Sequence, residues 1–315
     1  MRIDLLAPLR ASIEETVAFV RRAEAAGAAG VGVPDHLDYG RDGFVALALA
    51  ARAAPRIDLY PAVASVLTRH VFQLAALART MQEIAGARFK LVIGAGGSTA
   101  EQTGQPPASR MRMREVAVSI RALLAGESAE FGTSAQQRIE DVLPPGPPVL
   151  LAASGPKAVR LAGEVGDGAL LFTGVSAPTR ALAAELVAAG RAESGRAGQP
   201  FETTYVVPFS VGGSAAEARE RVRGAAFNWL RLGRFNAGLT RAGVSWRLPE
   251  SARALPDGLL AAICEHFFVT GTAADCAVRL EALSDVGAER ALLMPIGGAD
   301  ATEAALDAAG RLSAP

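Results

Sequence analysis

The stretch VLLAASGPKAVRLAGEVGDGALLF, residues 149–172, decides the fold because it contains one complete strand–helix–strand unit. Its short apolar runs, residues 149–153 and 169–172, are typical of strands buried in a parallel sheet. Between them, residues 156–165 have helical periodicity, and Pro156 stands at the first helical position, where no N–H is needed. The unit therefore predicts an α/β protein with parallel strands.

The same alternation of strand-like and helix-like segments continues along the rest of the chain. Further strands are predicted at residues 3–7, 30–34, 57–64, 89–93, 203–211 and 290–295. Further helices are predicted at residues 13–26, 43–54, 71–85, 110–124, 177–192, 272–286 and 301–312. Eight strands alternating with helices fit a (β/α)8 TIM barrel. A doubly wound open sheet is the weaker alternative, because the chain is long and regular for one such sheet.

One irregular segment, residues 214–268, follows the seventh predicted strand. It has helical patches and apolar side chains that need burial: Trp229, Phe235, Trp246, Leu259 and Leu260. Such an insertion suits a lid over a substrate pocket and a subunit interface equally well. We expect one barrel domain over residues 1–315, with residues 214–268 as its helical insertion.

The composition excludes several classes of function. Lys plus Arg and Asp plus Glu both number 32 in 315 residues, so no net charge favours nucleic acid. Two cysteines and three histidines lack the spacing of metal ligands, so no metal site is expected. The chain has no apolar run long enough for a bilayer and does not begin like a signal peptide. We therefore expect a cytoplasmic protein without a membrane partner.

The pair Asp35-His36 ends a short apolar run, residues 29–34, which is predicted to be a buried strand. Barrel enzymes place their chemistry at the C-terminal ends of their strands. A titratable ring beside a carboxylate at that position is a candidate functional site. The structural alternative is that His36 is an ordinary loop residue and Asp35 a helix cap.

Two glycine turns follow neighbouring predicted strands. Ser154-Gly155-Pro156 opens a helix, where free amide groups and the helix dipole favour an anion. Thr173-Gly174 closes the next strand, so the two turns could hold one phosphate between them. The structural alternative is a simple helix cap.

A third glycine turn, at Gly94 and Gly96, follows the fourth predicted strand. It would let a flat ring or a tail lie against the backbone, although a tight strand-to-helix turn explains it equally well. Ser65-Val66-Leu67-Thr68 leaves the third strand and mixes polar with apolar residues, as at the floor of a pocket.

Together these motifs resemble the bacterial luciferase-like superfamily of barrel oxidoreductases. The order is Asp35-His36, then residues 65–68, then the Gly94-Ala95-Gly96 turn, then residues 151–168, then Val269-Thr-Gly-Thr. The similarity covers nearly the whole chain outside residues 214–268, and residues 151–168 are its most specific part. Asp35-His36 resembles the branch that uses coenzyme F420, such as methylenetetrahydromethanopterin reductases and F420-dependent glucose-6-phosphate dehydrogenases.

The resemblance implies roles for individual residues. Asp35 would contact the deazaflavin, and His36 would stand near its reactive face as the catalytic residue. Ser65-Val66 would form a non-prolyl cis peptide behind the ring, next to the turn with Gly94 and Gly96. The cofactor phosphate would lie on a backbone formed by Ser154, Gly155, Pro156, Thr173 and Gly174.

The chain also departs from the sugar-phosphate dehydrogenases. Gly97 stands where those enzymes carry an acidic catalytic residue, and Ala95 replaces a threonine, so their substrate is not implied. The sequence therefore predicts an F420-dependent oxidoreductase that transfers a hydride to or from a small organic substrate, expected as a homodimer. The alternatives are an FMN-dependent luciferase-like monooxygenase and a non-catalytic family member that acts as a binding subunit.

Overall fold

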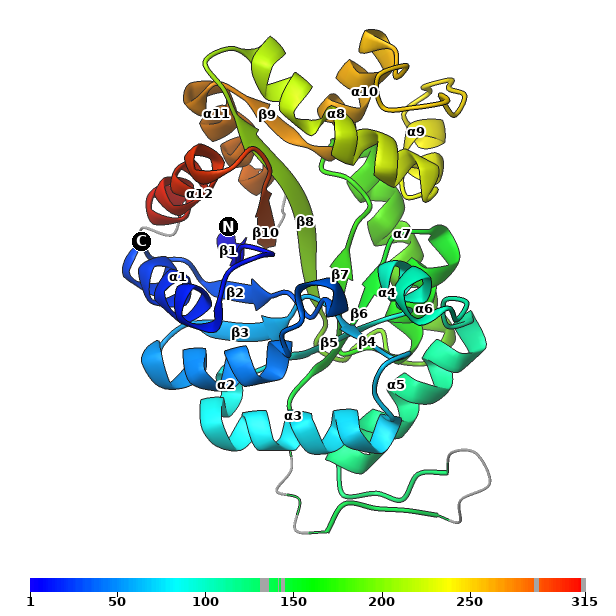
Figure 1. Cartoon of the computed structure of the whole chain (residues 1–315). Helices are drawn as coiled ribbons and strands as arrows, with labels where there is room; N and C mark the ends of the chain where they lie inside the picture. Colours follow the sequence, from blue (N-terminus) through cyan, green and yellow to red (C-terminus); the bar gives the residue numbers. More distant parts are fainter. Residues whose placement is uncertain (131–135, 141, 143–144, 286–288, 313–315) are drawn as a thin grey trace.

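The computed structural model describes residues 1–130, 136–140, 142, 145–285 and 289–312. Its strands form one parallel sheet in the order β3 (Asp58–Pro61), β2 (Gly30–Val33), β1 (Arg2–Leu6), β10 (Arg290–Pro295), β8 (Glu202–Val211), β7 (Gly168–Leu171), β6 (Val149–Ala153), β5 (Leu91–Gly94) and β4 (Ala64–Ser65). The two ends of this order meet, because Phe89 bridges Leu59 and the Lys90 amide donates to the Leu59 carbonyl at 3.1 Å. The predicted TIM barrel is confirmed (Figure 1).

The third barrel strand is interrupted. β3 pairs with β2, β4 pairs with β5, and the Ala62–Val63 peptide bond between them is cis. The prediction of a cis bond at Ser65–Val66 is therefore wrong. Ser65 is in register with Gly94 in a regular parallel ladder, so the chain changes partner strands before it reaches Ser65.

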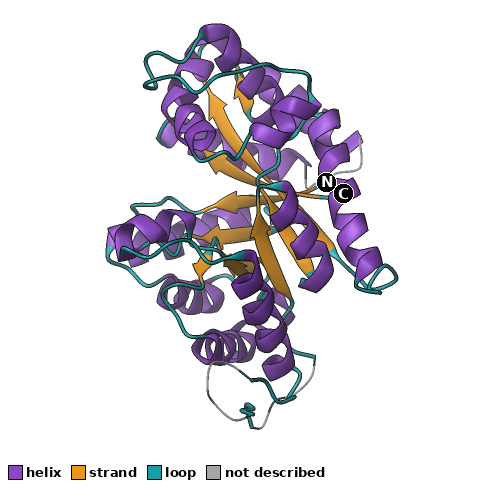
Figure 2. Ribbon diagram, turned by 90° about the vertical axis from the view of Figure 1, so that its right-hand side faces the viewer, coloured by secondary structure: helices purple, strands orange, loops and turns teal. Residues whose placement is uncertain are grey.

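Helices surround the strands (Figure 2). Those expected from the sequence are α1 (Ile13–Ala25), α2 (Gly43–Ala53), α3 (Val71–Ala85), α5 (Arg110–Leu124), α6 (Pro156–Val165), α7 (Ala177–Glu193), α11 (Ala273–Asp285) and α12 (Ala299–Leu312). Local signals define several ends; Ser12 and Glu15, for example, form a reciprocal capping box at α1. Val286, the predicted end of α11, lies outside the described residues. No described helix has the length and apolar character needed to cross a membrane.

The insertion contains α8 (Ala215–Arg231), α9 (Asn236–Arg241) and α10 (Asp257–Phe267), as the predicted helical patches suggested. The sequence did not predict the short elements α4 (Gly97–Thr103), η1 (Leu37–Tyr39), η2 (Gly86–Arg88) and β9 (Val269–Gly271). β9 extends the sheet, because it pairs with the last residues of the ten-residue strand β8. In Figure 1 the insertion lies beyond the C-terminal half of β8.

The barrel interior changes from charged to apolar along its axis. At the N-terminal ends of the strands it holds a charged layer: Asp4, Asp58, Lys90, Glu202 and Arg290. The middle is apolar, with Tyr60, Val92, Leu150, Leu170, Val206 and Leu292 in one cluster. The same cluster includes Trp229, Phe235 and Phe268, so the insertion packs onto the barrel interior.

Candidate functional site

The parallel barrel brings the predicted site residues to one end of the molecule. Because all paired strands run in the same direction, the loops that follow them open on the same face. Asp35 and His36 follow β2, and Ser65 and Val66 lie at and after β4. The three glycine turns follow β5, β6 and β7 on the same face.

Asp35 is buried and bound by protein groups. Its carboxylate forms a close bidentate ion pair with Arg69, in which Nη2 lies 3.1 Å from Oδ1, and Oδ1 also accepts from the Gly43 amide at 3.2 Å. Arg69 also binds Asp42 at 2.8 Å, and its guanidinium lies 5.0 Å from the centre of the Phe44 ring. The ion pairs join the loop after β2 to the loop after β4. The contact of Asp35 with a cofactor stays a prediction.

Arg69 also controls the ionisation of Asp42. Burial opposes ionisation of this carboxyl, but the hydrogen bond and positive charge of Arg69, together with the amides of Phe44 and Val45, lower the pKa of Asp42. The negative charges of Asp35 and Asp42 in turn raise the pKa of Arg69 against its burial. Asp42 and Arg69 therefore stay ionised at neutral pH, and the ion pairs of Arg69 hold the loop that carries His36.

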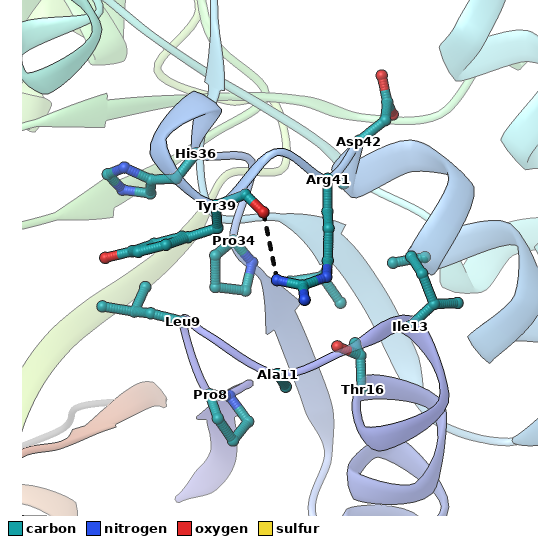
Figure 3. Close-up of a pocket in the computed structure, with 13 residues that line it drawn as sticks. Pro8, Leu9, Ala11, Ile13, Thr16, Pro34, His36, Tyr39, Arg41 and Asp42 are labelled. Atoms are coloured by element: carbon teal, nitrogen blue, oxygen red, sulfur yellow. Dashed lines mark hydrogen bonds between the residues drawn. The ribbon is translucent and has the colours of Figure 1, made fainter. Parts of the chain in front are cut away.

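His36 is half-buried and lies beside Tyr39, with 5.9 Å between ring centroids. Both side chains extend to the same side of η1, above Leu9, in a crevice between the loops after β1 and β2 (Figure 3). Arg10 lies over the Tyr39 ring at 5.6 Å, and Arg41 donates to the Tyr39 carbonyl at 3.2 Å. The sequence analysis missed Tyr39, although its spacing from His36 places both in one turn.

Small residues line one side of the barrel mouth. Ala62, Gly94 and Ala152 occupy it there; a Cβ on Gly94 would lie 3.0 Å from Val63 Cγ1 and 3.5 Å from Ala152 Cβ. Met294 of β10 and Phe172, which follows β7, belong to the same interior cluster. The backbone of β5 is buried and Val63 packs against Gly94, so the contact of this turn with a flat ring stays a prediction.

Packing against neighbouring side chains requires glycine at Gly96. Its φ is +77°, and a Cβ there would lie 2.6 Å from Ser65 Oγ and 2.7 Å from Leu67 Cδ1. Ser65 Oγ accepts from the Leu67 amide at 3.2 Å, and the Val66 amide donates to the Gly94 carbonyl at 3.2 Å. Ser65, Val66 and Gly96 therefore brace the two loops against each other.

The two glycine turns predicted to hold phosphate differ in whether the fold itself requires glycine there. Gly155 has φ −89° and ψ 156°, which any residue adopts, and a Cβ there would meet no atom within 4 Å. Gly174 has φ +102°, and a Cβ would lie 2.7 Å from the His266 carbonyl oxygen. That oxygen accepts from the amides of Val175 and Ser176 at 2.8 and 3.2 Å. Gly174 is thus required by packing against α10, whereas the protein itself does not require glycine at Gly155.

Ser154, Pro156 and Thr173 line one crevice, together with Arg234 and Gly238 of the insertion. The buried Thr173 Oγ1 has no hydrogen-bond partner among the described residues. Arg234 was not predicted from the sequence, because nothing in the local pattern places the segment between α8 and α9 at this crevice. An orphaned hydroxyl, the open space in front of Gly155 and a cation fit an anionic group such as a cofactor phosphate.

Comparison with known proteins agrees with this geometry. The family model described as luciferase-like monooxygenase matches residues 1–290. A 5,10-methylenetetrahydromethanopterin reductase from Methanolobus tindarius is 27% identical over 308 residues, 89% of this chain and 90% of that protein. An F420-dependent glucose-6-phosphate dehydrogenase from Beutenbergia cavernae is 36% identical over 177 residues, 51% of this chain and 53% of that protein.

A solved structure has the same fold over nearly its whole length. The coenzyme F420 dependent tetrahydromethanopterin reductase from Methanopyrus kandleri matches with a TM-score of 0.80 at 20% identity, covering 98% of this chain and 97% of that one. The resemblance inferred from Asp35-His36 and residues 151–168 is confirmed. With the family model matching almost all of its length, this chain belongs to the luciferase-like monooxygenase family.

Proposed function

We propose that this protein is an F420-dependent oxidoreductase that transfers a hydride between the deazaflavin and a small organic substrate. The observation that carries the proposal is the joint position of two features at the barrel mouth. One is the crevice of Ser154, Pro156, Thr173 and Arg234, which suits a phosphate. The other is a floor of small, partly exposed side chains, Ala62 and Ala152, beside the buried Gly94, which would suit a flat ring.

Some residues of the chain would bind the cofactor, and others would take part in the chemistry. The deazaflavin would supply hydride chemistry, and the barrel supplies position and electrostatics. Gly155 and Ser154 would hold the phosphate through the free amide end of α6. His36 would hold or move the proton that accompanies hydride transfer, with Tyr39 packed at its side. Asp35, with Arg69, keeps the loop of His36 in place.

Two relatives support the choice of cofactor. The glucose-6-phosphate dehydrogenase is described as F420-dependent, and the methylenetetrahydromethanopterin reductase is similar over most of both chains. The substrate of neither is carried over, because Gly97 and Ala95 occupy the turn in which the sugar-phosphate enzymes carry an acid and a threonine.

The second candidate is an FMN-dependent monooxygenase, which the description of the matched family favours. FMN also has a flat ring and a phosphate, so the same crevice and floor suit it. The cofactor decides the reaction class, because a reduced flavin reacts with oxygen and a deazaflavin transfers hydride instead.

Titration of the purified protein with F420 and with FMN separates the candidates. We expect a lower Kd for F420, followed by the change of F420 absorbance when an organic substrate is oxidised or reduced. A lower Kd for FMN and oxygen consumption with reduced FMN would replace the proposal by the monooxygenase. Uptake of neither cofactor would favour the non-catalytic family member.

A further inference from the structure

Arg234 differs from three other arginines of the insertion in having no acidic partner among the described residues. Arg223, Arg231 and Arg241 lie on α8 or α9, and each has a carboxylate within 4.0 Å: Asp257 at 2.6 Å, Glu101 at 3.8 Å and Glu185 at 2.6 Å. Arg234 has no ion pair with any carboxylate in the part of the chain that the structure describes. Its guanidinium lies instead over two aromatic rings, 5.2 Å from the centre of Phe172 and 4.9 Å from that of Trp229.

The backbone fixes this position. α8 ends at Arg231, and Gly233 adopts the left-handed conformation with φ +69°. The Gly233 amide donates to the Leu230 carbonyl at 2.9 Å, and the Arg234 amide donates to the Trp229 carbonyl at 3.0 Å. This is the Schellman motif, in which the residue after the glycine packs back on the last turn of the helix. Arg234 is therefore held over Trp229 by helix termination.

The surroundings make an unpaired cation costly. Trp229 is buried, Phe172 is half-buried, and burial lowers the pKa of Arg234. Aromatic faces compensate only part of the lost hydration of a guanidinium, whereas an anion would compensate more. Arg234 lines the crevice that also contains Ser154 and the orphaned Thr173 hydroxyl.

We propose that Arg234 anchors the phosphate of the bound cofactor from the insertion side, opposite the amide end of α6. This inference rests on the proposed function for the identity of the ligand. A guanidinium offers several donors in a fixed plane and binds phosphate oxygens in pairs. The insertion is then part of the cofactor site, and binding of the phosphate ties residues 214–268 to the barrel.

Trp229 provides a direct signal, because its ring lies against the proposed ligand-binding side chain. The chain has two tryptophans, so Trp246→Phe leaves Trp229 as the only one. In this background, inorganic phosphate is titrated against Trp229 fluorescence in the parent, in Arg234→Gln and in Arg241→Gln. Arg241 is the matched control, since it lies on the same insertion but is paired with Glu185.

We expect a saturating fluorescence change with phosphate in the parent and in Arg241→Gln, and none in Arg234→Gln. The Kd for F420 should rise about tenfold to a hundredfold in Arg234→Gln, as expected for loss of a charged hydrogen bond. Arg234→Lys, which keeps the charge, should lie between the parent and Arg234→Gln. Thermal unfolding of each variant shows whether the fold is retained.

The outcomes separate this inference from the proposed function. Equal Kd values for F420 in the parent and in a folded Arg234→Gln overturn the role of Arg234 and leave the proposed function standing. Phosphate binding that requires Arg234, in a protein that takes up FMN in preference to F420, supports the anchor and overturns the proposed cofactor. A loss of phosphate binding that is the same in Arg241→Gln contradicts the inference.

Discussion

Two arginines, one at each end of the barrel, differ in how their charge is compensated. At the N-terminal end, Arg290 is fully buried and has three carboxylates around it. At the C-terminal end, Arg234 lies between aromatic rings, with no ion pair to a carboxylate among the described residues. The ion pairs of Arg290 serve the fold, as those of Arg69 do at the other end, whereas the proposed role of Arg234 is to bind a ligand. This difference follows the general division of barrel enzymes into a stabilising and a catalytic face.

The charged residues at the N-terminal end pair with one another. Arg290 Nε lies 2.6 Å from Asp4 Oδ2, and the Tyr60 hydroxyl donates to the same oxygen at 2.6 Å. Lys90 Nζ lies 2.6 Å from Glu202 and 3.1 Å from Asp58. Burial raises the pKa of Asp4 although Arg290 opposes it, so the network depends on keeping Arg290 in place.

The largest expected effect is on turnover at the C-terminal end. His36→Ala should lower turnover by about 10²–10⁴, the usual contribution of a positioned acid or base. The Kd for F420 should change much less, because His36 is not among the residues that line the proposed phosphate crevice. Steady-state rates with F420 and any accepted substrate, and fluorescence titration of F420, measure the two quantities.

His70→Asn is the matched control for His36. His70 is the N-cap of α3, where its Nδ1 accepts from the Phe72 amide at 3.3 Å, and asparagine serves the same role. Turnover of this variant should stay near the parent value. A parent-like rate in His36→Ala would show that His36 is structural.

At the opposite end, Arg290→Met should lower the free energy of unfolding by about 3–5 kcal/mol, because it leaves Asp4 buried without its cation. Urea unfolding measures this loss. Arg2→Met is the control: Arg2 is 52% exposed, lies 4.0 Å from Glu202, and should contribute less than about 1 kcal/mol. Equal losses in the two variants would contradict the distinction between buried and exposed cations.

At the C-terminal end, Gly155→Asp should weaken cofactor binding without lowering the stability of the fold. Aspartate is a good N-cap and meets no atom at this position, so the unfolding free energy should stay equal or rise slightly. Repulsion of a phosphate should raise the Kd for F420 at least about tenfold. Gly155→Ser, which caps without charge, should show a smaller change. Unchanged affinity in Gly155→Asp would remove α6 from the binding site.

The smallest expected effect concerns the thiols. Burial raises the pKa of both Cys264 and Cys276 to about 11. Since the thiolate is the reactive form, a disulfide reagent at pH 8 should modify both slowly in the folded protein and rapidly in urea. The folded-state rate should rise about tenfold per pH unit below pH 11. Rapid reaction of Cys264 alone would show that the insertion opens, because this thiol lies in the insertion's apolar cluster.

Periodicity and local caps were sufficient for most of the barrel. Ser12 with Glu15, and Pro156 after Gly155, act within one turn of chain, so the ends of α1 and α6 follow from neighbouring residues. The short apolar runs correspond to buried parallel strands, and their number and order indicated the closed sheet. The family motifs lie at strand ends, which is why Asp35-His36 and residues 151–168 could be recognised without a structure.

Tertiary structure decided what depends on residues far apart in the chain. The partner of Asp35 is Arg69, 34 positions away, and Ser65 pairs in register with Gly94 of β5, while the cis bond lies earlier, at Ala62–Val63. Arg234 lines the same crevice as Ser154 and Thr173 only because the segment around α9 packs on α7. The amino-acid sequence thus determined the local elements, whose energies arise between neighbours along the chain. Long-range packing decided which charges are paired within the chain and which, like that of Arg234, have no carboxylate partner among the described residues.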